Sequence, residues 1–404
     1  MLLIGIDQSS QKHDICITDL QGRQLAYKEV NHTLPGFEWI HKQCQRLGVI
    51  PQDCLVALES AHSLLVDYLL DQGYQVHVVP GRVVNRYRDR YRQSRSCSDQ
   101  GDAAVLTNVL RNDRDHYVPL TADQPLTRQI CSQVRLLSTM KGNVARVSNQ
   151  LRQLLWRYFP LAAELFSKLD QPLTCAFIQA YPTPQKAQGL SKSAFETFCH
   201  QHRYWNKRYI ARRYGQLQAM QTFASAPIAN AYAQQAQSLA RVLGFLVKER
   251  DAAQKALTQS FEQHPDAHIY ASLPGAGEFL APALLSKFRD CRARFPTAAV
   301  AQAIAGTCPV TRKSGKRRHQ VLFRRACDRE FRFIATQFAR CSTADSGWAA
   351  AYFETIRPRV GKATHAYRCL ANRWIAIIWR LWTDRVEYDE AVHLRNRFAN
   401  RTRS

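Results

Sequence analysis

Four acidic residues within the first 102 positions have types and spacing that could form a metal site. Asp7 follows a short apolar run at the N-terminus, and Glu59 follows the apolar run Leu55–Leu58. Asp99 and Asp102 are three residues apart, so they share one face of a helix's first turn. Four carboxylates close together repel one another unless divalent cations neutralise them, and hard oxygen ligands select Mg²⁺ or Mn²⁺. Two ions about 4 Å apart can activate a nucleophile and stabilise the leaving oxygen in phosphodiester cleavage.

Each acid also has a structural interpretation. Asp99 could cap a helix, Asp102 could favour that helix's N-terminus through its charge, and Asp7 could occupy a turn. Asp14, close to the first apolar run, is interpreted as structural. The metal-site hypothesis therefore depends on the joint placement of the other four.

A serine in the C-terminal part of the chain lies within its most basic short segment. Ser314 belongs to the loop-like run Arg312–His319. Cations around a serine can stabilise the charge that develops when its hydroxyl attacks a phosphate. From the residues alone, a simple contact between Ser314 and a DNA backbone is the favoured interpretation. The side chains expected to contact nucleic acid here are Arg312, Lys313, Lys316, Arg317 and Arg318.

A glycine motif, Leu273–Gly277, precedes the predicted helix Phe279–Phe288. Gly275 and Gly277 would leave backbone N–H groups free at the helix N-terminus, which is a ready phosphate site. The pattern is typical of a helix-hairpin-helix motif that binds a DNA backbone. An ordinary turn before a helix explains it equally well.

The elements that must position the acids alternate between strands and helices. Three runs joined by turns predict an antiparallel meander, and two further apolar runs separated by helical patterns follow. The predicted strands are Leu2–Gln8, His13–Asp19, Arg23–Val30, Cys54–Ser60 and Tyr74–Pro80, and the predicted helices are Gly36–Leu47 and Ala61–Gln72. This order is expected for an α/β RNase H-like sheet. It also opens the actin-like ATPases and sugar kinases, but the sequence lacks the second glycine-rich phosphate loop that those proteins need.

Long helical patterns replace the strands after residue 112. Arg128–Phe159 and Ala236–Phe261 each carry a heptad-like stripe, which predicts antiparallel coiled-coil helices or an oligomerisation arm. The first stripe is Ile130, Val134, Leu137, Val144, Leu151, Leu154 and Leu155, and the second is Leu239, Val242, Leu246, Ala253 and Leu257. We therefore divide the chain into an α/β domain (1–112), a helical coiled-coil region (113–265) and a mainly α C-terminal domain (266–404).

Between the two long helical patterns, the segment His202–Tyr214 interleaves aromatic and basic residues. Aromatic rings among cations can stack on the bases of RNA or single-stranded DNA. A packed helix hairpin, in which arginine stems cover apolar surface, is an equally good interpretation.

The overall charge indicates a polyanionic partner. Lys and Arg total 56 against 32 acidic residues, which gives a formal net charge of +24. Such a surplus repels itself, and nucleic acid is the partner that most often compensates it, although a solvated basic surface is the alternative. The sequence shows neither a basic amphipathic anchor nor an apolar run long enough to span a bilayer, so no membrane partner is expected.

The twelve cysteines are scattered singly, without a CxxC pair or a histidine at zinc-finger spacing. They predict free buried thiols and no structural zinc. The N-terminus reaches Asp7 and Lys12 too early for a secretory signal peptide. The expected compartment is the cytoplasm, in association with a bacterial nucleoid.

Several segments together resemble the transposases of the one-ten insertion-sequence family, which are DEDD transposases related to the Piv site-specific invertase. The matching segments follow the family's order over nearly the whole chain. They are GIDQSSQKHD, ALES around Glu59, SDQGDAAVL, SLPGAG, KFRDCRARFPTAAVAQAIAGTCPV, KSG, and the tail from Trp348 through WIAIIWRLWTDRVEYDE. After Ser314, HQVLFRRACDREFR replaces the family's usual glycine-rich stretch.

The resemblance implies a RuvC-like N-terminal domain whose metal-binding tetrad is Asp7, Glu59, Asp99 and Asp102. It also implies a C-terminal transposase domain in which Ser314 forms a covalent phosphoserine link to DNA, and strand exchange through a Holliday-junction-like intermediate. Active sites in this family pair one subunit's tetrad with another subunit's serine, so a homo-oligomer (dimer or tetramer) is expected. The implied partners are double-stranded donor and target DNA and a structured bridge RNA that guides the enzyme.

Two other functions stay open. In the first, the protein is a RuvC-like, metal-dependent endonuclease of the Holliday-junction type, in which water attacks and Ser314 only binds DNA. In the second, it is a catalytically silent RNA- or DNA-binding protein.

Overall fold

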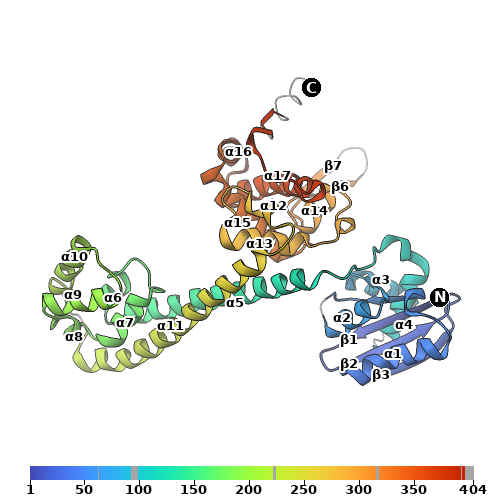
Figure 1. Cartoon of the computed structure of the whole chain (residues 1–404), viewed down its shortest axis with the longest axis horizontal. Coiled ribbons are helices and arrows are strands. Elements are labelled where there is room, and N and C mark those ends of the chain that lie inside the picture. The colour runs from blue at the N-terminus through green and yellow to red at the C-terminus, as the bar shows by residue number, and fades with distance from the viewer. Residues whose placement is uncertain (62, 92–98, 222–223, 315–317, 393, 396–404) are drawn as a thin grey trace. The chain divides into compact units, whose positions relative to one another are not determined.

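The computed structural model describes residues 1–61, 63–91, 99–221, 224–314, 318–392 and 394–395, with the side chains of 90, 91, 99, 312–314, 318 and 319 outside the description. The chain forms two compact units, Met1–Gln124 and Pro125–Ser404 (Figure 1). The first unit is α/β and the second is mostly helical. The three-part division at residues 112 and 265 stays a prediction.

The first unit is built on a five-stranded mixed sheet of order β3-β2-β1-β4-β5. The first three strands form an antiparallel meander, β4 lies parallel to β1, and β5 lies parallel to β4. The strands are β1 (Leu2–Gln8), β2 (Lys12–Thr18), β3 (Gln24–Asn31), β4 (Cys54–Leu58) and β5 (Gln75–Val78). The five predicted strands are therefore confirmed.

Helices cover both faces of this sheet (Figure 1). Even-numbered β1 residues such as Ile4 and Ile6 pack with α1 (Leu34–Arg46) and α2 (Leu64–Asp71). Leu3, on the other face, packs with residues of α3 (Gly81–Tyr91) and α4 (Asp99–Asp113). Two short 3₁₀ turns, Pro51–Asp53 and Arg114–His116, complete the unit. This two-sided burial explains why β1 and β4 are apolar at nearly every position.

Gly5 in β1 allows α4 to contact the sheet backbone. A Cβ atom at this position would lie 1.9 Å from the carbonyl oxygen of Ala103 in α4. We predict that Gly5→Ala lowers the stability of the first unit by about 1–3 kcal/mol, as overpacking of a rigid core does. Thermal unfolding of the full chain measures the effect. The control is Gly142→Ala, at a helical glycine of α5 (Pro125–Leu155) whose added Cβ would meet nothing within 4 Å. Equal melting temperatures for the Gly5 variant and the wild type would contradict the prediction.

The second unit contains two long helices, α5 and α11 (Ala226–Glu262), that pack against each other. All seven residues of the apolar stripe predicted for α5 are buried, so that prediction is confirmed. The stripe predicted for α11 is wrong in part, because Val242 is exposed. The buried face of α11 consists mainly of small residues: Ala229, Ala233, Ala236, Ala240, Leu243 and Val247. Alanines let two helices approach closely, but an apolar stripe of large residues does not reveal them.

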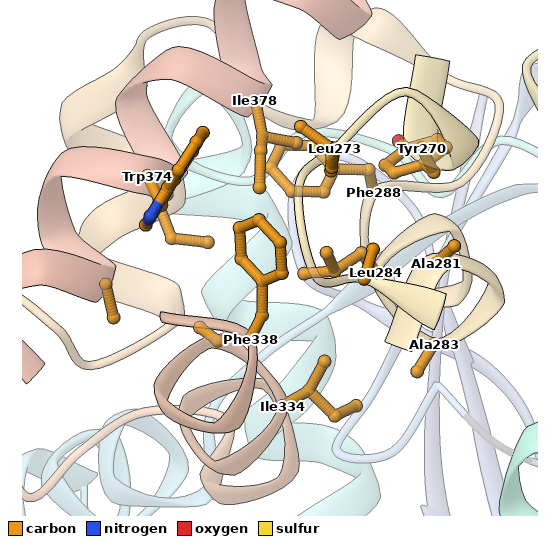
Figure 2. Close-up of a cluster of buried hydrophobic side chains, with 14 of the residues drawn as sticks. Tyr270, Leu273, Ala281, Ala283, Leu284, Phe288, Ile334, Phe338, Trp374 and Ile378 are labelled. Carbon is orange, nitrogen blue, oxygen red and sulfur yellow. The ribbon is translucent and has the colours of Figure 1, made fainter. Parts of the chain in front are cut away.

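Two hydrophobic cores form around this helix pair. One core joins the C-terminal half of α5 and the N-terminal half of α11 to the smaller helices between them. Those helices are α6 (Pro160–Glu164), α7 (Pro172–Ala180), α8 (Pro184–Gln188), α9 (Lys192–Gln201) and α10 (Lys207–Gln218). The other core joins the opposite ends of α5 and α11 to the C-terminal helices and is rich in aromatic rings, such as Phe288, Phe338 and Trp374 (Figure 2).

Besides its helices, the described C-terminal part contains one hairpin of two strands, β6 (Val310–Ser314) and β7 (Arg318–Leu322). The helices are α12 (Ala267–Ala271), α13 (Gly277–Phe288), α14 (Ala298–Ile304), α15 (Arg329–Asp345), α16 (Gly347–Val360) and α17 (Ala363–Asp384), with a 3₁₀ turn at Arg292–Arg294. Among the described residues, no helix is long and apolar enough to cross a membrane.

A buried polar contact ties the start of α5 to the C-terminal core. Thr127 donates a hydrogen bond to Asp290 (2.8 Å), and its hydroxyl lies 2.9 Å from His264. A threonine, a histidine and an aspartate in this order resemble a nucleophilic triad. Thr127 is fully buried, however, so a substrate cannot reach its hydroxyl and the contact is structural.

Candidate functional site

Asp7, in β1, and Glu59, the residue that follows β4, lie at the same end of two neighbouring parallel strands. Ile6 of β1 pairs with Leu58 of β4, so the next residue of each chain segment falls on the same side of the sheet. That side is the one covered by α3 and α4, because Gly5 contacts α4. The prediction that these two strands are neighbours is thus confirmed. Both acidic residues lie at the C-terminal ends of the parallel strands β1 and β4.

The carboxylate of Glu59 extends to the first residue of α3. A Cβ atom on Gly81 would lie 2.6 Å from Glu59 Oε2, so the space that a side chain would need is taken by this carboxylate. The N-terminus of a helix carries partial positive charge, which favours a carboxylate there.

Asp102 lies one residue before the α4 position that contacts Gly5, and its side chain is held by an arginine. Arg88 of α3 donates from Nε to Asp102 Oδ1 (2.8 Å) and from Nη2 to Oδ2 (2.6 Å). Asp102 is only 9% exposed, so this bidentate pair is partly desolvated. Asp99 begins α4, but its side chain lies outside the described part of the chain.

The oxygen donors of these acids suit Mg²⁺ or Mn²⁺. Among the described side chains, however, no group of three or more His, Cys, Asp or Glu residues is arranged to hold a metal ion. The ligands that would hold an ion are Asp7, Glu59, Asp102 and Asp99. In the described arrangement both Asp102 oxygens are engaged by Arg88. The donor set fits a hard cation, and the Arg88 contact would have to open before Asp102 could bind one.

Two further residues lie beside these acids. Arg88 was not among the predicted site residues, since its partner on another helix could not be inferred from local spacing. Asp14, interpreted from the sequence as structural, pairs directly across from Asp7 in the β1–β2 ladder and accepts a hydrogen bond from the Tyr27 hydroxyl. The alternation of the meander was a usable signal, because it places Asp14 on the same face as Asp7.

Ser314 is the last residue of β6 and pairs with Arg318 of β7. The loop expected over Arg312–His319 is corrected to a β-hairpin in its described parts, where Arg312 and Lys313 also belong to β6. The tip, including Lys316 and Arg317, lies outside the described residues. The acids belong to the first unit and Ser314 to the second.

The two glycines of the Leu273–Gly277 motif have different surroundings. Both have positive φ, 73° for Gly275 and 56° for Gly277, so both favour glycine. Gly275 packs against the α15 backbone, where a Cβ would lie 2.8 Å from the carbonyl oxygen of Cys341. Gly277 is exposed at the start of α13, with open space where a Cβ would be. Packing therefore accounts for Gly275, while the backbone at Gly277 stays accessible.

The aromatic-basic segment divides between core and surface. Tyr204 and Tyr214 pack against the core formed by α6–α10. Trp205 is 65% exposed and stacks on His200 with ring centroids 4.7 Å apart. The packed helices α9 and α10 agree with the helix-hairpin interpretation of this segment. The exposed ring of Trp205 agrees with the interpretation that it stacks on nucleic-acid bases.

Comparison with known proteins identifies the family. A protein-family model described as "Transposase" matches residues 4–160, and one described as "Transposase IS116/IS110/IS902 family" matches residues 267–354. The "Mini-circle putative transposase for IS117" of Streptomyces coelicolor is 30% identical over 394 residues, covering 96% of this chain and 95% of that protein. An insertion element IS110 protein of 43.6 kDa from the same organism is 25% identical over 97% of this chain and 96% of its own length. An IS116 protein of 44.8 kDa from Streptomyces clavuligerus is 24% identical over 95% and 94%. The chain belongs to the IS110 family of insertion-sequence transposases.

Proposed function

We propose that this transposase is a metal-dependent DNA recombinase that cuts and rejoins DNA through Ser314. The observation that carries the proposal is the placement of Asp7 and Glu59 at the same end of the adjacent parallel strands β1 and β4, on the face covered by the helix that contains Asp102. The strand order of the first unit supports an RNase H-like, RuvC-like fold for this domain. Membership of a transposase family supports DNA as the substrate.

In this mechanism the Ser314 hydroxyl attacks a backbone phosphorus and forms a phosphoserine ester, while a deoxyribose hydroxyl leaves. The serine proton passes to a nearby base, and the leaving oxygen takes up a proton. Attack by a deoxyribose hydroxyl of the other DNA strand reverses these steps and releases Ser314. Mg²⁺ or Mn²⁺ at the four acids would supply positive charge to the attacking and leaving oxygens. Arg312, two residues before Ser314 and therefore on the same face of β6, would bind a phosphate that flanks the reacting one, and Lys313 would add positive charge from the other face.

The proposal also includes an assembly and a guide. Because the acids and Ser314 occupy different units, a homo-oligomer can supply them from two subunits. A formal net charge of +24 supports binding to two kinds of polyanion. One is DNA, as donor and as target, and the other is a structured guide RNA. Lys316, Arg317, Arg318 and Gly277 are the further proposed nucleic-acid contacts.

Removal of divalent metal tests the proposal. A strand-exchange assay with purified protein, DNA and the RNA transcribed beside the gene is expected to lose all product in a chelator. Activity should return when Mg²⁺ is added, because the ion would lower the repulsion among the acids and stabilise the leaving oxygen. DNA binding, measured in the same chelator, is the control and should persist. Full strand exchange without divalent metal would refute the metal site.

A second function rests on the acids of the first unit alone. A RuvC-like endonuclease needs only the first unit's carboxylates and a water nucleophile. It predicts metal-dependent cutting without any protein–DNA adduct.

A further inference from the structure

Two arginines from different helices pack on one exposed ring. Phe323 directly follows β7 and is 48% exposed. The guanidinium carbon of Arg332, on α15, lies 4.7 Å from the centre of this ring, and that of Arg368, on α17, lies 4.6 Å from it. Both distances fall within the range of a cation–π contact. Three elements therefore place two cations around the base of the hairpin that carries Ser314.

The charges of this pair are not neutralised within the described part of the chain. None of the ion pairs found there includes Arg332 or Arg368. The acidic residues at the start of α15, Asp328 and Glu330, instead contact Lys287 at 3.1 and 2.6 Å. Burial and the neighbouring charge of Arg332 lower the pKa of Arg368. Two cations held together without a counterion favour an anion between or beside them.

The pair is also fixed in position. Arg332 Nη1 donates a 3.0 Å hydrogen bond to the carbonyl oxygen of Arg324. Arg324 in turn donates to the carbonyl oxygens of Cys308 and Pro309, each at 3.3 Å, and so joins the two ends of the hairpin. An arginine already held against a ring and a backbone carbonyl loses less conformational freedom when it binds a phosphate.

We propose that Arg332 and Arg368, packed on Phe323, bind a backbone phosphate of the DNA strand that Ser314 attacks. Guanidinium groups match phosphate oxygens in charge and in donor geometry. Leu322 pairs with Val310, so Ser314 lies four residues further along β6, a distance of about 13 Å at the rise of a β-strand. The site would thus hold the strand a short way from the reacting phosphate. The attack by Ser314 rests on the proposed function; the phosphate contact itself does not.

The salt dependence of DNA binding tests the contact. We would measure the affinity of the full chain for a fluorescent DNA duplex between about 50 and 200 mM salt. Arg332→Gln combined with Arg368→Gln should reduce the slope of log affinity against log salt by about 0.9, the value for one phosphate charge neutralised. The matched control is Arg373→Gln, which removes another α17 arginine that lies over a ring, 5.8 Å from the centre of Tyr352. The control should bind with the wild-type slope.

An unchanged slope in the double variant would overturn the proposal, and so would an equal loss in the Arg373 control. A loss of slope with an RNA duplex alone would overturn the assignment to DNA. Because the measurement needs no cleavage, failure of the serine chemistry would leave this result intact.

If the variants do not fold, His365 gives a second readout in the wild-type chain. Burial and the charge of Arg368 lower the pKa of His365. A phosphate bound at Arg368 should raise that pKa, as followed by NMR with and without the duplex. No change on DNA binding would count against the site.

Discussion

Replacing Ser314 with alanine is expected to abolish the covalent protein–DNA adduct and to reduce strand exchange by at least about 10³-fold. Loss of a nucleophile commonly costs an enzyme this much or more, because the covalent intermediate cannot form without it. The adduct is measured by denaturing electrophoresis of labelled DNA, followed by mass spectrometry of the linked peptide. Affinity for DNA should change little, since the basic residues of the hairpin remain.

Thr311→Ala is the matched control for this substitution. Thr311 supplies an exposed hydroxyl on the same strand, three residues before Ser314. Its loss should leave both adduct and strand exchange at wild-type levels. An adduct that persists in the Ser314 variant would exclude this serine. Metal-dependent cutting that continues without any adduct would instead favour the endonuclease.

Glu59→Gln is expected to have an effect of similar size through the metal. Glutamine has nearly the same shape, so it still fits over Gly81, but it lacks the charge that holds a divalent cation. We predict a loss of at least about 10³-fold in strand exchange and a much weaker Mg²⁺ affinity by calorimetry. Thermal stability should stay close to that of the wild type, because no packing is lost.

The control for this variant is Glu29→Gln, another carboxylate of the same sheet. Glu29 lies on β3, is exposed, and pairs with Lys12 at 2.6 Å. Its removal should alter neither metal affinity nor strand exchange. Wild-type activity in the Glu59 variant would show that this acid is structural, and the candidate metal site would have to be abandoned.

The sequence predicted those elements whose pattern is local. Alternation and short apolar runs predicted the five strands, and large apolar residues at heptad spacing predicted the buried face of α5. The face of α11 was missed because alanines at Ala233, Ala236 and Ala240 carry little hydrophobic signal. The hairpin at Ser314 was missed because a basic run gives no apolar alternation.

The candidate site was predictable only in part for a similar reason. Chain order and strand type are enough to place Asp7 beside Glu59. Arg88 meets Asp102 only because α3 packs on α4, and such contacts between helices leave no mark in local spacing. The pair Arg332 and Arg368 was missed likewise, since its two members are 36 positions apart and meet on a third element.

The bidentate contact between Arg88 and Asp102 has a consequence for how the protein is made. A structural zinc domain cannot fold before its ion arrives, because the ion is the counter-charge of its ligands. Here the chain carries a counter-charge of its own for one acid, supplied from the neighbouring helix. We therefore expect newly synthesised protein to complete this helix pair without any bound ion, because Arg88 already neutralises Asp102.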